Sequence, residues 1–148
     1  MLYPDFRDML SALSGEGVEY LVVDAYALAA HGVPRATGDL DLWVSAPEEN
    51  AGRVLRALQT FRAPLEEVRQ ADLVTPDTVL QIGLAPRRVD LLTSIDDVHF
   101  EEAWPSRVEV ENDGLTLPVI GREHLIRNKR AVGRPQDLAD AARLESSS

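Results

Sequence analysis

The segment Leu21–Val44, LVVDAYALAAHGVPRATGDLDLWV, ends in two aspartates that alternate with leucines: Asp39, Leu40, Asp41 and Leu42. On a β-strand this alternation places both carboxylates on one face and both leucines on the opposite face, toward a core. Two like charges held side by side are costly unless a cation or a proton neutralises one of them. Because carboxylate oxygens are hard ligands, the pair favours a Mg²⁺ or Mn²⁺ ion.

The length and composition predict one ordinary domain. The chain has 148 residues, of which 45% are hydrophobic and 27% are charged, and it has no cysteine. No apolar run approaches the roughly 20 residues that a membrane span needs, and the acidic start MLYPDFRD does not resemble a signal peptide. We therefore expect a single cytoplasmic domain over residues 1–148 with no membrane partner and with a frayed tail at 146–148.

The charge balance disfavours a general nucleic-acid binder. The formal net charge is −10, from 25 acidic and 15 basic side chains, whereas proteins that follow phosphate backbones normally carry the opposite sign. Basic residues nevertheless cluster near the C-terminus, at Arg122, Arg127, Lys129, Arg130 and Arg134. This cluster leaves a local basic face open as an alternative.

Hydrophobic periodicity and turn signals predict an α/β (α+β) fold with helices packed on a β-sheet. The predicted helices lie at 5–13, 25–30, 45–61, 123–132 and 135–144, with one or two helical turns at 65–73 and one turn at 100–104. The predicted strands lie at 20–23, 39–44, 78–82, 88–92, 108–110 and 115–120. Asn112-Asp113-Gly114 is a strong hairpin signal between the last two strands, and a second hairpin is expected to join 78–82 to 88–92.

A third acidic candidate, Asp90, lies between Val89 and Leu91 in a predicted strand. A carboxylate in that setting either faces solvent or shares a polar site. For any one of the aspartates alone, a solvated acid is the more common explanation. For Asp39, Asp41 and Asp90 together, after a short helix and a turn, a common site is what a resemblance to a known family implies.

This order of elements resembles the DNA polymerase β-like nucleotidyltransferase superfamily. More closely, the segment is similar to small bacterial nucleotidyltransferase-like proteins related to abortive-infection toxins, with the approximate pattern V-G-G-x-A-x-x-x-H-G-x-x-R-x-T-x-D-x-D. The positions that match are His31, Gly32, Arg35, Thr37, Asp39 and Asp41. The stretch from Lys129 to Asp140 is similar to the K-x-x-x-G-R-x-x-D segment of that family. The likeness covers about residues 18–144 and implies a mixed, twisted sheet of the polymerase β palm type.

The resemblance also implies a function. It implies transfer of a nucleotide from an NTP to a protein or RNA acceptor, tRNA included, by the toxin of a toxin–antitoxin pair or by a phage-defence component. Asp39, Asp41 and Asp90 would be the metal-binding and catalytic residues, with Asp90 activating the acceptor hydroxyl. The positions that would contact the nucleotide are Asp24, Ala25, Arg35, Thr37, Lys129 and Arg134. A cognate antitoxin is the implied partner, and the hairpin and apolar helix faces allow a homodimer.

One departure from the family pattern concerns the nucleotide. Asp24-Ala25 stands where the family has its glycine pair. We expect Asp24 to be the N-cap of the helix at 25–30, which stabilises the fold, and to weaken nucleotide binding through its negative charge. A less favoured alternative makes it an extra metal ligand. The departure supports a second function, a binding or regulatory protein that has lost turnover, and the carboxylates alone allow a third, a divalent-ion binder.

Several other residues keep two interpretations each. His31 precedes a glycine at a helix end, where a structural role is the commoner explanation. Arg35 would either pair with Asp39 or Asp41 or contact the substrate. Trp43 and Trp104 are expected to pack rather than to stack on a base.

Overall fold

A computed structural model of the chain describes residues 2–35, 38–61, 69–83 and 88–146. The α-helices are α1 (Pro4–Gly15), α2 (Asp24–Ala30), α3 (Glu48–Phe61), α4 (Phe100–Ala103), α5 (Arg122–Val132) and α6 (Pro135–Ser146), with 3₁₀ turns η1 (Gln70–Val74) and η2 (Trp104–Ser106). The strands are β1 (Tyr20–Val23), β2 (Leu40–Val44), β3 (Val79–Ile82), β4 (Val89–Leu92), β5 (Val108–Asn112) and β6 (Leu115–Val119).

The six strands form one mixed sheet in the order β3-β4-β2-β1-β6-β5. β2 pairs with β4 and β1 pairs with β6 in parallel, and the other neighbours are antiparallel. Both predicted hairpins, β3-β4 and β5-β6, are present. The predicted α/β (α+β) class with a mixed sheet is therefore confirmed.

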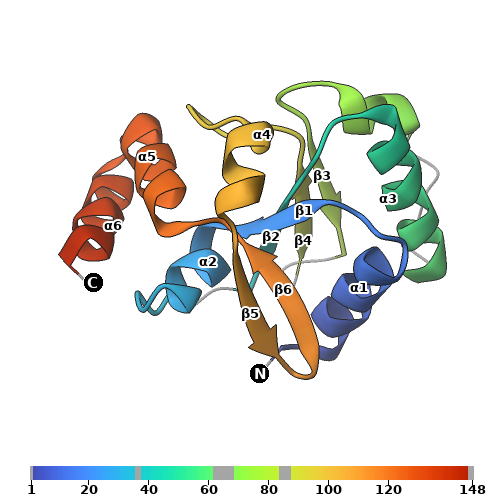
Figure 1. Ribbon diagram of the computed structural model, residues 1–148, viewed down its shortest axis with the longest axis horizontal. Coiled ribbons are helices and arrows are strands. Elements are labelled where there is room, and N and C mark those ends of the chain that lie inside the picture. The colour runs from blue at the N-terminus through green and yellow to red at the C-terminus, as the bar shows by residue number, and fades with distance from the viewer. Residues whose placement is uncertain (1, 36–37, 62–68, 84–87, 147–148) are drawn as a thin grey trace.

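Helices lie on both sides of the sheet (Figure 1). α1 and α3 lie side by side on one side, and α5 and α6 pack against each other on the other, beyond α2. α1 buries the residues that its spacing placed on one face: Phe6, Met9, Leu10 and Leu13. All four residues of β1 are buried, so this central strand is covered on both faces.

Three details differ from the sequence predictions. Asp24 is the first residue of α2 rather than its N-cap, which is Val23, and no side chain caps this helix. α3 begins at Glu48, and the Ser45 amide donates to the carbonyl of Glu19, so the expected capping box of Ser45 and Glu48 does not form. Ser146, the first residue of the tail predicted to fray, belongs to α6, and 147–148 lie outside the described residues.

The predicted helical turns at 65–73 lie partly outside the described residues, and the described part contains η1.

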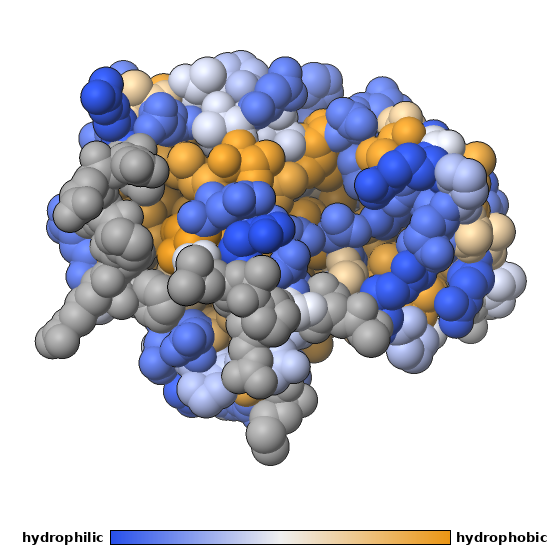
Figure 2. All heavy atoms as spheres, turned by 180° about the vertical axis from the view of Figure 1, so that it is seen from behind, coloured by the Kyte–Doolittle hydropathy of each residue, from blue (hydrophilic) through white to orange (hydrophobic). Residues whose placement is uncertain are grey.

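One face of the molecule carries an apolar area. Seen from behind, apolar atoms lie across the middle of this face, with hydrophilic atoms among them and along the upper and right sides (Figure 2). Val79 and Val108, on the edge strands β3 and β5, are exposed individually, as single apolar side chains often are. Within the described parts of the chain, no helix combines the length and the apolar character needed to cross a membrane.

Candidate active site

The sheet brings two of the predicted carboxylates together. Asp41 in β2 lies directly opposite Asp90 in the parallel neighbour β4, and Asp39 stands one residue before β2. Leu40 and Leu42, which alternate with the aspartates, are at most 1% exposed and belong to the core. The alternation therefore turns the acids to one face and the leucines to the other, as the sequence predicts.

Arg88 is bound between Asp39 and Asp90, which the sequence analysis did not anticipate. Its Nε donates to Asp90 Oδ1 at 2.7 Å, and its Nη2 donates to Asp90 Oδ2 and to Asp39 Oδ2, each at 3.2 Å. The Arg88 backbone N–H donates to Asp39 Oδ1 at 3.3 Å. The hydrogen bond and the charge of Asp90 raise the pKa of the guanidinium above its ordinary value. Arg88 therefore neutralises much of the negative charge that the strand pairing concentrates here.

Asp41 is the carboxyl most strongly affected by this concentration of charge. Burial raises its pKa from the ordinary 3.8 to about 7, with further contributions from the charges of Asp24, Asp90 and Asp39 and from a hydrogen bond with Asp90. A carboxyl that holds its proton near neutral pH is typical of functional sites. The charge of Asp24 makes the largest contribution to the raised pKa of Asp41 after burial, so the Asp24 carboxylate belongs to the same electrostatic cluster as Asp39, Asp41 and Asp90.

The three carboxylates have the chemistry of a site for Mg²⁺ or Mn²⁺, because all their donors are hard oxygens. In the described part of the chain, however, no three acidic or histidine side chains are grouped as a set that could hold a metal ion. Arg88 is bound to both oxygens of Asp39 and to both oxygens of Asp90. The donor atoms therefore suit such an ion chemically, and in this arrangement they are hydrogen-bonded to Arg88.

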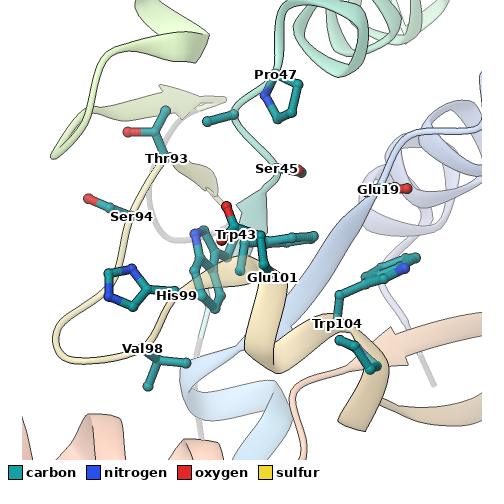
Figure 3. A pocket seen from close by; sticks show the side chains of 13 residues that line it. Glu19, Trp43, Ser45, Pro47, Thr93, Ser94, Val98, His99, Glu101 and Trp104 are labelled. Atoms are coloured by element: carbon teal, nitrogen blue, oxygen red, sulfur yellow. The ribbon is translucent and has the colours of Figure 1, made fainter.

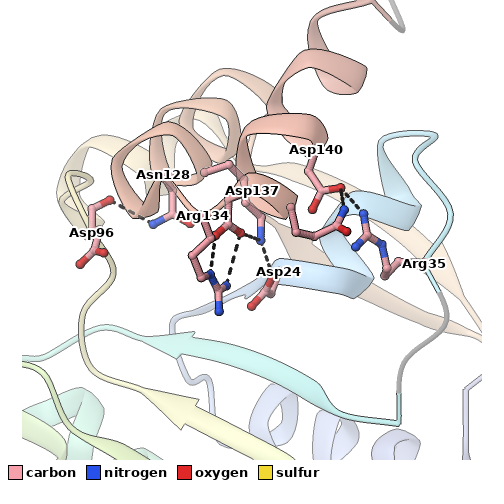
Figure 4. Close-up of polar contacts among 9 residues, drawn as sticks. Asp24, Arg35, Asp96, Asn128, Arg134, Asp137 and Asp140 are labelled. Atoms are coloured by element: carbon pink, nitrogen blue, oxygen red, sulfur yellow. Dashed lines mark hydrogen bonds and ion pairs between the residues drawn. The ribbon is translucent and has the colours of Figure 1, made fainter.

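Asp24 has a backbone conformation that favours glycine, the residue found at this position in the V-G-G-x-A pattern of the similar family. Its φ is 57°, in the left-handed region that residues with a Cβ rarely adopt. Its carboxylate does not cap α2 and instead accepts a hydrogen bond from Lys129 Nζ at 2.5 Å (Figure 4). Asp24 thus joins the start of α2 to α5, and the role expected of it as a helix cap was wrong.

Lys129 is buried against two carboxylates rather than exposed to solvent. Its side chain is 5% exposed and contacts Asp24 and, at 3.4 Å, Asp137 Oδ1. Asp137 also accepts a hydrogen bond from Arg134 Nε at 2.6 Å. The Arg134 hydrogen bond, together with the charge of Lys129, lowers the pKa of Asp137. Of the two predicted phosphate contacts, Arg134 is mostly exposed and Lys129 is enclosed.

Arg35 pairs with neither of the aspartates considered for it in the sequence. Its guanidinium is bound to Asp140, which also accepts a hydrogen bond from Gln136 at 3.0 Å (Figure 4). Asp140 is 2% exposed, so this ion pair anchors the loop after α2 to the helix α6. Thr37, another predicted nucleotide contact, lies outside the described residues.

The basic residues between 122 and 134 do not form an unpaired positive face. Each is bound within the chain: Arg122 to the carbonyl of Leu144, Arg127 to Asp97, Lys129 to Asp24, Arg130 to Glu145 and Arg134 to Asp137. Four of these five partners are carboxylates. This region is therefore largely neutralised, which disfavours an extended contact with nucleic acid.

A pocket of about 420 Å³ lies further along β2 from the carboxylates (Figure 3). Trp43 lines it and is two residues beyond Asp41 on the same strand, so both side chains belong to one face of the sheet. Phe100 packs edge-on against Trp43 and stacks on Trp104, which gives the pocket an aromatic wall. Glu19 and Glu101 add negative charge to the lining.

His31 has the structural role that the sequence favoured. It is the C-cap residue after α2, and its Nε2 lies 2.8 Å from the carbonyl oxygen of Ile120, just after β6. The ring therefore joins the end of the helix to the strand behind it.

In the described residues, the arrangement of the helices on a six-stranded mixed sheet matches that of solved nucleotidyltransferase folds. TM1012 from Thermotoga maritima, assigned as a nucleotidyltransferase, superposes with a TM-score of 0.65 at 18% identity, covering 100% of this chain and 97% of that protein. The lincosamide antibiotic adenylyltransferase LnuA gives a TM-score of 0.61 at 12% identity, and the match covers 100% of this chain and 99% of LnuA.

A third solved structure, the antibiotic-resistance factor ANT(2'')-Ia, gives a TM-score of 0.57 at 15% identity, covering 95% of this chain and 80% of that protein. No protein-family model and no curated protein sequence matches the chain. At these identities the likeness shows the fold, and the predicted nucleotidyltransferase fold is confirmed.

Proposed function

We propose that the chain is a nucleotidyltransferase that moves a nucleotide from an NTP to an acceptor hydroxyl with Mg²⁺ or Mn²⁺. The observation that supports this most is the register of the sheet, which sets Asp41 beside Asp90 with Asp39 next to them, in a fold shared with nucleotidyltransferases. A divalent cation on these carboxylates would neutralise negative charge on the phosphates.

The residues of the chain divide the remaining tasks. Asp90 would accept the proton of the acceptor hydroxyl, since its buried carboxylate lies directly opposite Asp41 on the neighbouring strand. Arg134 has an exposed planar guanidinium that would bind a phosphate. Lys129 is buried and would orient the carboxylates of Asp24 and Asp137 through its ion pairs with them. Arg35 would hold the loop before the acids in place through Asp140.

The resemblance and the charges of the chain rank the classes of acceptor. The sequence resemblance favours a protein or RNA acceptor and a role as toxin beside a cognate antitoxin, or in phage defence. The neutralised basic cluster and the net charge of −10 make RNA the least favoured of these.

A small-molecule acceptor is the second candidate. The pocket of about 420 Å³ beside Trp43 has the size of a small-molecule site, and the structural neighbours LnuA and ANT(2'')-Ia were solved with lincomycin and with adenylyl-2''-tobramycin.

The test is calorimetric titration with each of the four NTPs in the presence of Mg²⁺. The parent is compared with the double variant Asp39→Asn/Asp41→Asn and with the control Glu109→Gln/Glu111→Gln. The control makes the matching acid-to-amide changes at two residues with the same spacing on the edge strand β5, which β1 and β6 separate from β2. We expect binding in the parent and the control and its loss in the aspartate variant. Equal binding in all three would contradict the proposal.

A further inference from the structure

Arg88 is bound at the position where the proposed function needs a metal ion. All four carboxylate oxygens of Asp39 and Asp90 accept hydrogen bonds from Arg88, three of them from the guanidinium and one from the backbone N–H. The two aspartates come from different segments, before β2 and within β4, so Arg88 is the cation that bridges them. The contact is semi-buried, with 26% of the Arg88 side chain and 12% of the Asp90 side chain exposed.

The strand geometry holds Arg88 in this place. Arg88 precedes β4 and is two residues from Asp90, so extended backbone directs both side chains to one face. Leu40 N–H donates to the Arg88 carbonyl at 2.9 Å, which ties the residue to the start of β2 next to Asp39. Arg88 is thus placed on the carboxylates by the same strand pairing that assembles them.

We propose that Arg88 competes with the divalent cation for Asp39 and Asp90, and that it couples metal binding to nucleotide binding. This inference rests on the proposed function. A metal ion that arrives alone must displace the guanidinium and leave it without a carboxylate partner. A metal ion that arrives with a triphosphate brings anionic oxygens, and the planar fork of Arg88 is suited to bind them in two-point fashion.

The coupling has a thermodynamic signature. The chain binds a divalent ion weakly in the absence of NTP, and each ligand strengthens the binding of the other by the same factor. Replacing Arg88 by a neutral residue removes the competitor, so the ion alone binds more tightly. The same replacement removes the phosphate contact, so the gain disappears when the nucleotide is present.

The experiment measures the dissociation constant of Mn²⁺ by electron paramagnetic resonance, with and without a non-hydrolysable ATP analogue. It compares the parent with Arg88→Gln and with Arg127→Gln as a matched control. Arg127 is also an arginine paired with two acids, Asp97 and Glu102, and Arg127→Gln changes the net charge by the same amount away from the site. We expect Arg88→Gln to bind Mn²⁺ alone about tenfold more tightly and to lose most of the coupling to the nucleotide, while Arg127→Gln stays within about twofold of the parent.

A second variant covers the case in which Arg88→Gln folds poorly, because Asp39 and Asp90 are then left without their counter-ion. Arg88→Lys keeps the charge but supplies a compact ammonium that does not span both aspartates in the same way. It should lie between the parent and Arg88→Gln in affinity for Mn²⁺ alone. Affinities for Mn²⁺ that are unchanged or weaker in both variants would overturn the proposal.

Two results separate this inference from the proposed function. In the first result, Arg88→Gln binds Mn²⁺ more tightly than the parent, adding Asp39→Asn removes this binding, and no variant binds NTP. The competition between Arg88 and the metal ion is then supported, whereas the transferase function and the coupling to the nucleotide are contradicted. If NTP and Mn²⁺ bind the parent cooperatively and Arg88→Gln leaves that cooperativity unchanged, the role of Arg88 fails and the proposed function stands.

Discussion

Asp24→Gly tests whether the residue at the start of α2 weakens the nucleotide site. Asp24 has a φ of 57° and a carboxylate that is 48% exposed and paired with Lys129. Glycine relieves the left-handed backbone, worth roughly 1 kcal/mol, but adds a similar entropy to the unfolded chain. Loss of a half-exposed ion pair costs a further 0–1 kcal/mol or so. We therefore expect the free energy of unfolding to change by no more than about 1 kcal/mol.

The effect on nucleotide binding should be larger. The Asp24 charge is close enough to the site to raise the pKa of Asp41. A unit charge about 6 Å from a phosphate charge is repelled by roughly 3 kcal/mol at an effective dielectric constant of about 20, before screening by salt and by Lys129. If screening leaves about half of this repulsion, removing the Asp24 charge strengthens binding by about 1.4 kcal/mol. NTP should therefore bind Asp24→Gly at least about tenfold more tightly than the parent.

The assay is titration of Mg²⁺-NTP by calorimetry, with two controls. Asp24→Asn removes the charge but keeps a side chain that tolerates a positive φ, so it separates charge from backbone strain. Asp77→Gly relieves the same φ of 57° at a position in the turn before β3, where Asp77 binds Ser94 instead. The reasoning is refuted if Asp24→Gly and Asp24→Asn bind NTP with the affinity of the parent.

Two further predictions concern pH and the buried lysine. Asp41 has a pKa of about 7 in the folded chain against an ordinary 3.8, so its folded form holds the proton more tightly. Its contribution to stability is complete below pH 3.8 and falls, by at most about 4 kcal/mol, as the pH rises through 7. Urea unfolding from pH 5 to pH 8 should therefore show a steeper loss for the parent than for Asp41→Asn, and parallel curves would contradict this cause. Lys129→Met leaves Asp137, which is 2% exposed, with one cation fewer, and should lower the free energy of unfolding by about 2–4 kcal/mol. Arg130→Met, which breaks an exposed pair with Glu145, should cost less than about 1 kcal/mol, and equal losses in the two variants would show that burial of Lys129 is not the cause.

The local structure of this chain follows from its sequence. The spacing of Phe6, Met9, Leu10 and Leu13 predicted α1, and the Asn112-Asp113-Gly114 signal predicted the β5-β6 hairpin, where Asp113 and Gly114 both have positive φ. The D-L-D-L alternation predicted which face of β2 is acidic. Each of these depends on residues a few positions apart, whose geometry is fixed by the helix or strand itself.

The pairing of charges was decided only by the tertiary structure. Arg88 and Asp39 are 49 residues apart, and Arg35 and Asp140, like Lys129 and Asp24, are 105 residues apart. Which partner each cation meets depends on the strand order and on where α5 and α6 pack, and periodicity in the sequence carries no information about either. The sequence by itself therefore determined the acidic face and the elements that build it. The fold decided that Arg88, which shares a strand face with Asp90, also reaches Asp39 and that Lys129 is enclosed against Asp24, because those contacts exist only once β2 and β4 are side by side and α2 meets α5.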